Sequence, residues 1–231
     1  MNRRSFIRGM AGTAAASAFL GMGTAFADEA LPEIPAPAPN PEDMFGVDLN
    51  INVGTIDEWL GRPDVVYRDV RMLFDPADYG AIGGDADLSA TVAGFKIIPY
   101  PFLASLSALP VEGAYAAECL YTLTWNEDGS IASATPNYVE SEIILKDLFP
   151  QDKPIFIMCG GGGYAGMTKS LLIFLGWDEN LLYNIGGNWG YVGENAVELK
   201  VYPEEADGVE YLATWNADYA YIEFARLHPI A

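Results

Sequence analysis

The stretch PIFIMCGGGGYAGMTKSLLIFLGW, Pro154 to Trp177, decides the fold. Its apolar run ends at Cys159 and is typical of a strand that is buried on both faces. Four glycines follow, then a segment with the composition of a helix, and then the apolar segment NLLYNIGG. Strand, helix and strand within about thirty residues predict a βαβ unit with two parallel strands. We therefore expect an α/β fold built on a parallel sheet with flanking helices.

The flanking sequence predicts further elements. Upstream, we expect a short helix that begins after Thr55 as its N-cap, and a strand from Val65 to Val70. The segment AYAAECLYTLTWNEDGSIASATPN predicts a β-hairpin that turns at Asn126–Gly129. YVESEIILKDLF has the apolar spacing of a helix. From Val197 onward, aromatic residues predict two or three additional strands that pack through their rings.

Three segments differ in composition. Residues 1–27 carry a paired-arginine start, a weakly apolar stretch and the small-x-small site Ala25-Phe26-Ala27, which resembles a twin-arginine export signal. Residues 28–45 are rich in proline, which favours an extended linker. Residues 46–231 are long enough for a single folded domain. The sequence thus predicts export to the periplasm or the cell exterior, with no stable membrane span after the signal is cleaved.

The charge and the rarity of two residue types limit the chemistry. The chain has 32 acidic against 12 basic residues and a formal net charge of −20, which argues against nucleic acid and anionic lipid surfaces as partners. Two cysteines and one histidine give neither a zinc-binding cluster nor a CxxC pair. His228, the fourth residue from the C-terminal end, is a poor candidate for a Ser-His-Asp triad and is expected at the surface.

The glycine loop partly matches a nucleotide-binding motif. Gly161, Gly163 and Gly166 fit G-x-G-x-x-G between a strand and a helix. That motif also needs a carboxylate at the end of the next strand, where this chain has Asn184. A phosphate loop of the Gly-Lys-Ser/Thr type fails as well, because Met167 follows Gly166. These departures argue against a nucleotide site.

A reactive thiol is the alternative function for this loop. Cys159 lies where a parallel strand passes into a helix, and the backbone N–H groups of residues 160–165 could turn inward as an anion nest. The positive end of the following helix adds to this effect, so we expect the loop to favour a thiolate or persulfide anion. A buried, inert cysteine beside a tight turn explains the same residues without any chemistry.

The segment from Ile155 to Gly187 also resembles the catalytic segment of the rhodanese-like sulfurtransferases. In that family an apolar strand, Cys-x-x-Gly, a helix, Leu-Gly-aromatic, a strand and Gly-Gly follow one another, as do Cys159, Gly162, Leu175–Trp177 and Gly186–Gly187 here. Asp69-Val70-Arg71 and residues 94–99 (GFKIIP) are similar to two upstream family motifs. The resemblance spans roughly residues 50–191 in patches, and residues 104–137 stand as an inserted hairpin.

The resemblance implies that Cys159 carries a persulfide and passes sulfane sulfur from a small donor to an acceptor, without metal or organic cofactor. It implies that the substrate lies against the loop, and that Asp69 and Arg71 support the site. The residues of the loop that would bind substrate are Gly160, Gly161, Gly162, Gly163, Tyr164 and Ala165.

One departure from the family bears on the substrate. The loop lacks arginine and lysine, and Tyr164 stands where many relatives have a cation or hydroxyl residue. Tyr164 can donate one neutral hydrogen bond, which is weaker than a charge-assisted one. This argues against thiosulfate as the substrate, and against the phosphate-ester hydrolysis of related loops that hold a dianion with arginine.

Two other functions fit the same residues. The domain could bind a small sulfur species or a protein partner without turnover. Alternatively, Cys119 and Cys159 could exchange between dithiol and disulfide, which requires their α-carbons to lie within about 7 Å of each other.

Overall fold

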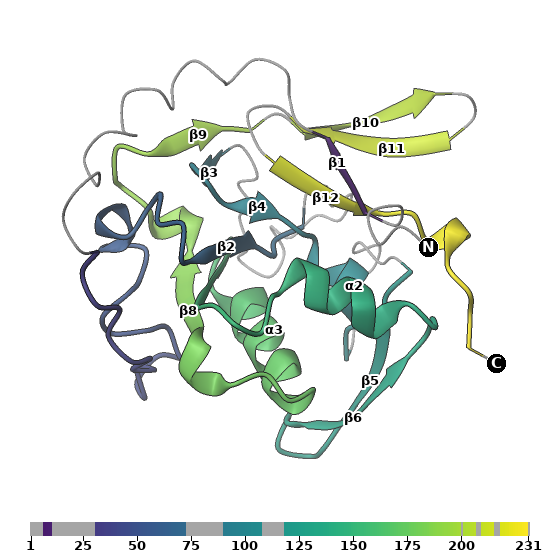
Figure 1. Ribbon diagram of the computed structural model, residues 1–231, viewed down its shortest axis with the longest axis horizontal. Helices are drawn as coiled ribbons and strands as arrows, with labels where there is room; N and C mark the ends of the chain where they lie inside the picture. Colours follow the sequence, from purple (N-terminus) through teal and green to yellow (C-terminus); the bar gives the residue numbers. More distant parts are fainter. Residues whose placement is uncertain are drawn as a thin grey trace, which may run out of the picture.

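The computed structural model describes residues 7–10, 31–72, 90–107, 118–199, 201–206, 209–214 and 218–230. Its central sheet contains five parallel strands and one antiparallel edge strand (Figure 1). In spatial order these are β1 (Ile7–Met10), β12 (Asp218–Ile222), β4 (Lys96–Ile97), β2 (Val66–Asp69), β7 (Ile155–Cys159) and β8 (Leu182–Gly187). The expected α/β fold with a parallel sheet is confirmed.

The edge strand β1 belongs to the segment that is expected to be an export signal. It pairs antiparallel with β12, from Ile7 opposite Ile222 to Met10 opposite Tyr219. Cleavage after Ala27 would remove β1 and leave β12 as the edge of the sheet. Export and cleavage remain predictions.

Three two-stranded sheets surround the central one. The predicted hairpin is confirmed as β5 (Tyr121–Trp125) and β6 (Ile131–Pro136), with a register shift between Thr124 and Trp125. β3 (Ala90–Val92) pairs with β9 (Ala196–Glu198), and β10 (Val201–Ala206) pairs with β11 (Val209–Thr214). The last of the expected C-terminal strands, β12, is a member of the central sheet and not an addition to it.

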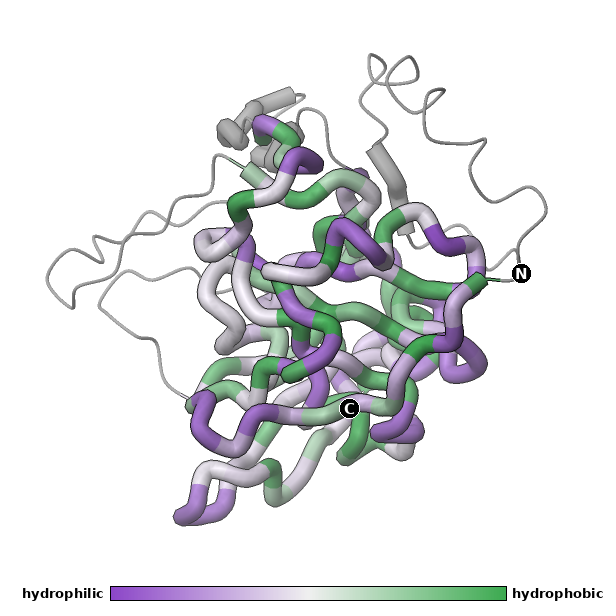
Figure 2. The backbone as a smooth tube through the Cα atoms, turned by 90° about the vertical axis from the view of Figure 1, so that its left-hand side faces the viewer, coloured by the Kyte–Doolittle hydropathy of each residue, from purple (hydrophilic) through white to green (hydrophobic). Residues whose placement is uncertain are grey.

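Helices cover one face of the sheet. In the described part of the chain, the α-helices are α1 (Tyr100–Leu103), α2 (Ser141–Leu148) and α3 (Gly163–Phe174), and the 3-10 helices are η3 (Ile56–Glu58), η5 (Glu179–Leu181), η6 (Asn188–Gly190) and η7 (Phe224–Arg226). Buried side chains of α2 and α3 share one apolar core with Ile155 and Ile157 of β7. Figure 2 shows hydrophobic stretches gathered inside the molecule and hydrophilic ones at its outer turns. Burying that apolar face drives the packing of helices on the sheet.

The opposite face of the sheet is covered by irregular chain. Ile51 and Ile56 form a second core with Phe156 and Met158 of β7. Thr55 precedes η3 as expected, but its hydroxyl donates to Asn50 O (2.9 Å), so it makes no side-chain cap bond.

The Pro-rich segment, which is expected to be an extended linker, lies against the domain. Residues 31–38 are without helix or strand, as their composition predicts. Ile34 packs against the second core, Arg62 Nη1 donates to Pro32 O (2.7 Å), and Tyr183 Oη donates to Pro35 O (2.8 Å). Extended proline-rich chain leaves its carbonyl oxygens free, and these two donors use them. Among the described residues, no helix has the length and apolar character needed to cross a membrane.

Candidate functional site

Cys159 is the last residue of β7, which lies between β2 and β8 in the central sheet. The apolar run predicted as a doubly buried strand is buried at every position, and Cys159 itself is 1% exposed. In open α/β sheets, the carboxyl ends of the strands are where ligands usually bind. The cysteine therefore lies at the position that the sequence predicts, but beneath the surface.

Backbone amides of the glycine loop point at the sulfur. The Gly162 N–H donates to Cys159 Sγ at 3.0 Å, and the backbone N–H groups of Tyr164 and Ala165 also lower the pKa of the thiol. We call these three amides the amide cradle. Gly162, just before α3, has φ of +97°, a left-handed conformation that favours glycine. Three of the six expected loop residues thus act on the sulfur through their backbone amides.

Burial outweighs the amide cradle in setting the protonation of the thiol. Desolvation is the largest effect on the Cys159 pKa and raises it, and the nearby Asp69 charge raises it further. The amides of Ala165, Gly162 and Tyr164 lower the pKa, but the net direction is upward. The loop amides therefore act in the expected direction, towards the thiolate, but the burial of the sulfur outweighs them and the thiol is favoured overall.

This raised pKa predicts slow and strongly pH-dependent alkylation. In a Cys119→Ser variant, we expect the rate of iodoacetamide reaction at Cys159 to have its midpoint at a higher pH than in the urea-unfolded chain. The neutral thiol stabilises the fold below the unfolded-state pKa, and that contribution is lost as pH rises through the folded-state pKa. A folded-state midpoint below the unfolded one would mean that the cradle dominates over burial.

Two glycines allow the loop to pack closely on the end of β8. Gly187 pairs with Cys159, and a Cβ added to Gly187 would lie 1.9 Å from Gly160 O. A Cβ added to Gly160 would lie 2.6 Å from the ring of Trp189, and the backbone N–H of Trp189 donates to Gly160 O (3.1 Å). The half-exposed Trp189 ring therefore covers the loop. The signal in the sequence that could have identified this contact is an aromatic residue just after Gly186 and Gly187.

Tyr164 contributes both backbone and ring to the site. Its amide belongs to the cradle, and its ring stacks on Tyr100 with 5.3 Å between centroids and 21° between planes. Its hydroxyl donates to Met72 Sδ at 3.8 Å. Tyr100 had no functional signal in the sequence, because residues 100 and 164 are brought together only by the fold.

Asp69 and Arg71 form a buried ion pair at the end of β2. Arg71 Nε donates to Asp69 Oδ2 at 2.7 Å, and the Thr91 hydroxyl donates to the same oxygen at 2.7 Å. Both charged residues are 1% exposed or less. Arg71 Nη1 and Nη2 are buried without an acceptor among the described residues. The pair lies one strand away from Cys159, since the Val70 N–H donates to Met158 O (2.7 Å).

Asn184 connects the loop to the N-terminal part of the domain. Its Nδ2 donates to Phe45 O (2.8 Å) and Gly162 O (3.2 Å), and its Oδ1 accepts from the Gly186 N–H (3.0 Å). In the sequence, Asn184 is notable only because it stands where the nucleotide-binding motif needs a carboxylate. A polar side chain inside the apolar strand NLLYNIGG is the signal that could have identified it.

The two cysteines are both free and have different partners. Cys119 Sγ donates to Tyr121 O (3.3 Å) and lies 3.5 Å from Asn137 Nδ2, whereas Cys159 Sγ is held by the cradle. A disulfide between them is thus not formed in this structure. His228, expected at the surface, has an exposed side chain whose Nδ1 lies 2.6 Å from Glu140 Oε1.

Within the described ranges, no three His, Cys, Asp or Glu side chains gather where they could hold a metal ion. No protein-family model, curated protein or solved structure matches the chain.

Proposed function

We propose that this chain is an exported, rhodanese-like sulfurtransferase that carries sulfane sulfur on Cys159. The observation that supports this most is the amide cradle, in which three backbone N–H groups meet at one sulfur. Fixed amide donors of this kind stabilise a sulfur anion without needing a charged side chain.

The proposed reaction has two displacements. The Cys159 sulfur attacks the sulfane sulfur of a donor, a Cys159 S–S bond forms, and the donor's own S–S bond breaks. The proton of the thiol passes to the departing thiolate of the donor. An acceptor thiolate then attacks the outer sulfur, and Cys159 leaves as a thiolate held by the cradle. No external oxidant is required, because sulfur of one oxidation level is exchanged between thiols.

The buried state of the sulfur sets a condition on this reaction. Cys159 is 1% exposed, Tyr164 packs against the core that contains it, and the Trp189 ring lies against Gly160 and Gly161. A donor therefore reaches the sulfur only when surrounding groups move. Exposure to water on opening removes part of the desolvation that raises the Cys159 pKa, so opening also favours the reactive thiolate.

The test is mass spectrometry of the Cys159 peptide in a Cys119→Ser protein. After exposure to an organic persulfide or polysulfide, we expect this peptide to gain one sulfur atom, which cyanide removes. A Cys119→Ser/Cys159→Ser double variant should show only the background of the buffer. If Cys159 stays a plain thiol with every donor, the sulfurtransferase proposal fails.

A second candidate is a binding module without turnover. The raised pKa and near-complete burial of Cys159 favour it, since both suppress the nucleophile. In that case Cys159→Ser should leave ligand binding intact, and sulfur transfer should be undetectable in both proteins.

A further inference from the structure

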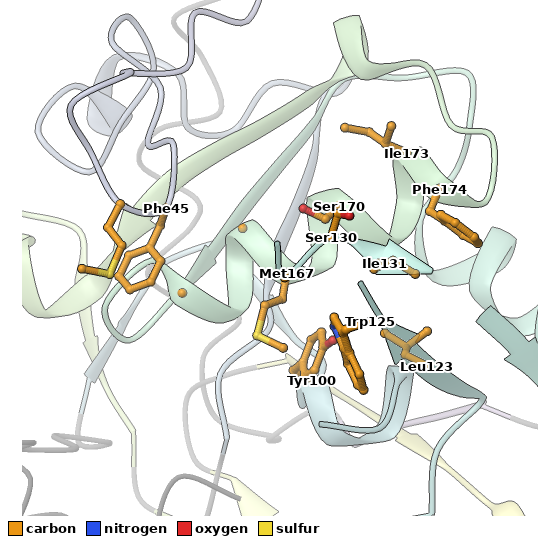
Figure 3. Close-up of a pocket in the computed structure, with 14 residues that line it drawn as sticks. Phe45, Tyr100, Leu123, Trp125, Ser130, Ile131, Met167, Ser170, Ile173 and Phe174 are labelled. Atoms are coloured by element: carbon orange, nitrogen blue, oxygen red, sulfur yellow. The ribbon is translucent and has the colours of Figure 1, made fainter. Parts of the chain in front are cut away.

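A groove runs beside the helix that begins at the amide cradle. It has a volume of about 540 Å³, and its walls come from α3, the hairpin β5–β6 and the chain around Phe45 and Tyr100. Figure 3 shows Tyr100, Trp125 and Met167 converging at one end, with Ile173 and Phe174 further along α3. This size is within the range of small-molecule sites, about 300–1,000 Å³.

The helix α3 is apolar on the face that lines the groove as well as on its buried face. Its buried residues are Ala165, Thr168, Leu171 and Leu172. Its groove-lining residues are Gly163, Gly166, Met167, Ser170, Ile173 and Phe174. They are spaced three and four apart and so form one stripe along the helix. A helix on the surface normally carries charged or polar residues opposite its buried face, and this stripe has a single serine.

The hairpin supplies the facing wall with the same chemistry. Leu123 is buried and Trp125 half-buried, whereas the alternate residues Thr122 and Thr124 are exposed. This alternation directs the apolar side chains of β5 toward the groove. None of the residues that line the groove is charged at neutral pH, although the chain carries a net charge of −20. An uncharged groove on so acidic a protein matches an uncharged occupant.

The groove and the cradle share the first turn of α3. Gly163 and Gly166 line the groove, while the neighbouring amides of Tyr164 and Ala165 lower the Cys159 pKa. Glycine at these two positions lets Phe45 pack closely on the start of the helix, since a Cβ would lie 3.4 Å from its ring at Gly163 and 3.0 Å from its O at Gly166. Tyr100 lines the groove and stacks on Tyr164, so one aromatic pair separates groove from cradle.

We propose that the groove binds a neutral, mainly apolar small molecule with an aromatic ring, and that this is the carbon part of the sulfur compound used at Cys159. The identity of the ligand as a sulfur compound rests on the proposed function, whereas the binding itself does not. Aromatic side chains at both ends of the groove offer edge-to-face contacts to a ring. The exposed side chain of Ser170 offers one hydrogen bond to a polar group of the ligand.

The binding test uses the full chain with Cys159→Ser, so that no sulfur chemistry is needed. We expect the neutral dye Nile red to bind with enhanced fluorescence, and benzyl mercaptan, a neutral aromatic thiol, to displace it. Met167→Glu places a charge in the wall and should weaken both by about tenfold or more. Val139→Glu is the matched control, because Val139 is exposed but lies outside the groove. It should leave both affinities unchanged.

Equal binding by the Met167→Glu and Val139→Glu proteins would overturn the inference. A second result would also overturn it: no dye binding, together with a dimer in sedimentation that Met167→Glu dissociates. The apolar face would then be an interface between two copies of the chain. In the protein with Cys159 intact, benzyl persulfide should load Cys159 better than thiosulfate, and Met167→Glu should remove that preference.

The experiments distinguish failure of the sulfurtransferase proposal from failure of the groove proposal. Dye binding without any sulfur on Cys159 would refute the sulfurtransferase and leave the groove as a binding site. Sulfur loading that Met167→Glu does not change would retain the enzyme and refute the assignment of the groove to its substrate.

Discussion

Replacing Gly187 with alanine is expected to lower the free energy of unfolding by about 3 kcal/mol or more, the upper end for overpacked sites. The new methyl group would lie 1.9 Å from Gly160 O and 2.5 Å from Gly161 Cα. Both are backbone atoms of the loop, so no side-chain rotation relieves the clash. Gly187 has φ of −124°, which alanine adopts freely, so the whole effect comes from this contact.

The expected local result is displacement of the glycine loop from β8. The Trp189 N–H would lose its bond to Gly160 O, and the cradle would no longer be held over Cys159. We therefore expect faster alkylation of Cys159 together with a lower urea midpoint. Gly190→Ala is the control, since its Cβ would lie 3.9 Å from Val53 Cγ1, an ordinary contact. It should change stability by less than about 0.5 kcal/mol. Equal urea midpoints for Gly187→Ala and Gly190→Ala would contradict the close approach of Gly187 to Gly160 O.

The sequence predicts those parts of the fold that depend on neighbouring residues. The run from Ile155 to Cys159, the glycine loop, the helix α3 and the strand β8 follow from local composition, as does the hairpin turn at Asn126–Gly129. In each case the signal is a change of hydrophobic period or a turn residue within a few positions. Because the loop directly follows Cys159, the sequence also predicts that amides of the loop lie close to the sulfur.

Long-range contacts account for what the sequence does not predict. β12 joins the central sheet beside β4, more than a hundred residues earlier in the chain, and the proline-rich segment finds donors in Arg62 and Tyr183. The raised pKa of Cys159 also depends on contacts between distant parts of the chain. The amides near Cys159 follow from the loop, but its desolvation comes from the apolar core in which it is buried.

The buried pair at the end of β2 gives the second large effect. Asp69→Ala is expected to lower the free energy of unfolding by about 3–5 kcal/mol, the range for removing one partner of a buried ion pair. The carboxylate accepts from Arg71 Nε and Thr91 Oγ1, and its loss leaves a guanidinium that cannot deprotonate. Two nitrogens of Arg71 already have no described acceptor. Glu142→Ala, which breaks an exposed pair with Lys146, should cost only about 0.5 kcal/mol or less.

A double variant separates a structural role of this pair from a role in the reaction. Asp69→Leu/Arg71→Met removes both charges and fills their space, so most of the stability lost in Asp69→Ala should return. Removing the Asp69 charge should also lower the Cys159 pKa, because that charge raises it in the native protein. If the pair only supports the sheet, the double variant should load sulfur on Cys159 at least as fast as the native chain. If the double variant recovers its stability but no longer loads sulfur on Cys159, Arg71 contacts the donor. Arg71, just after β2, then supplies the cation that the loop lacks.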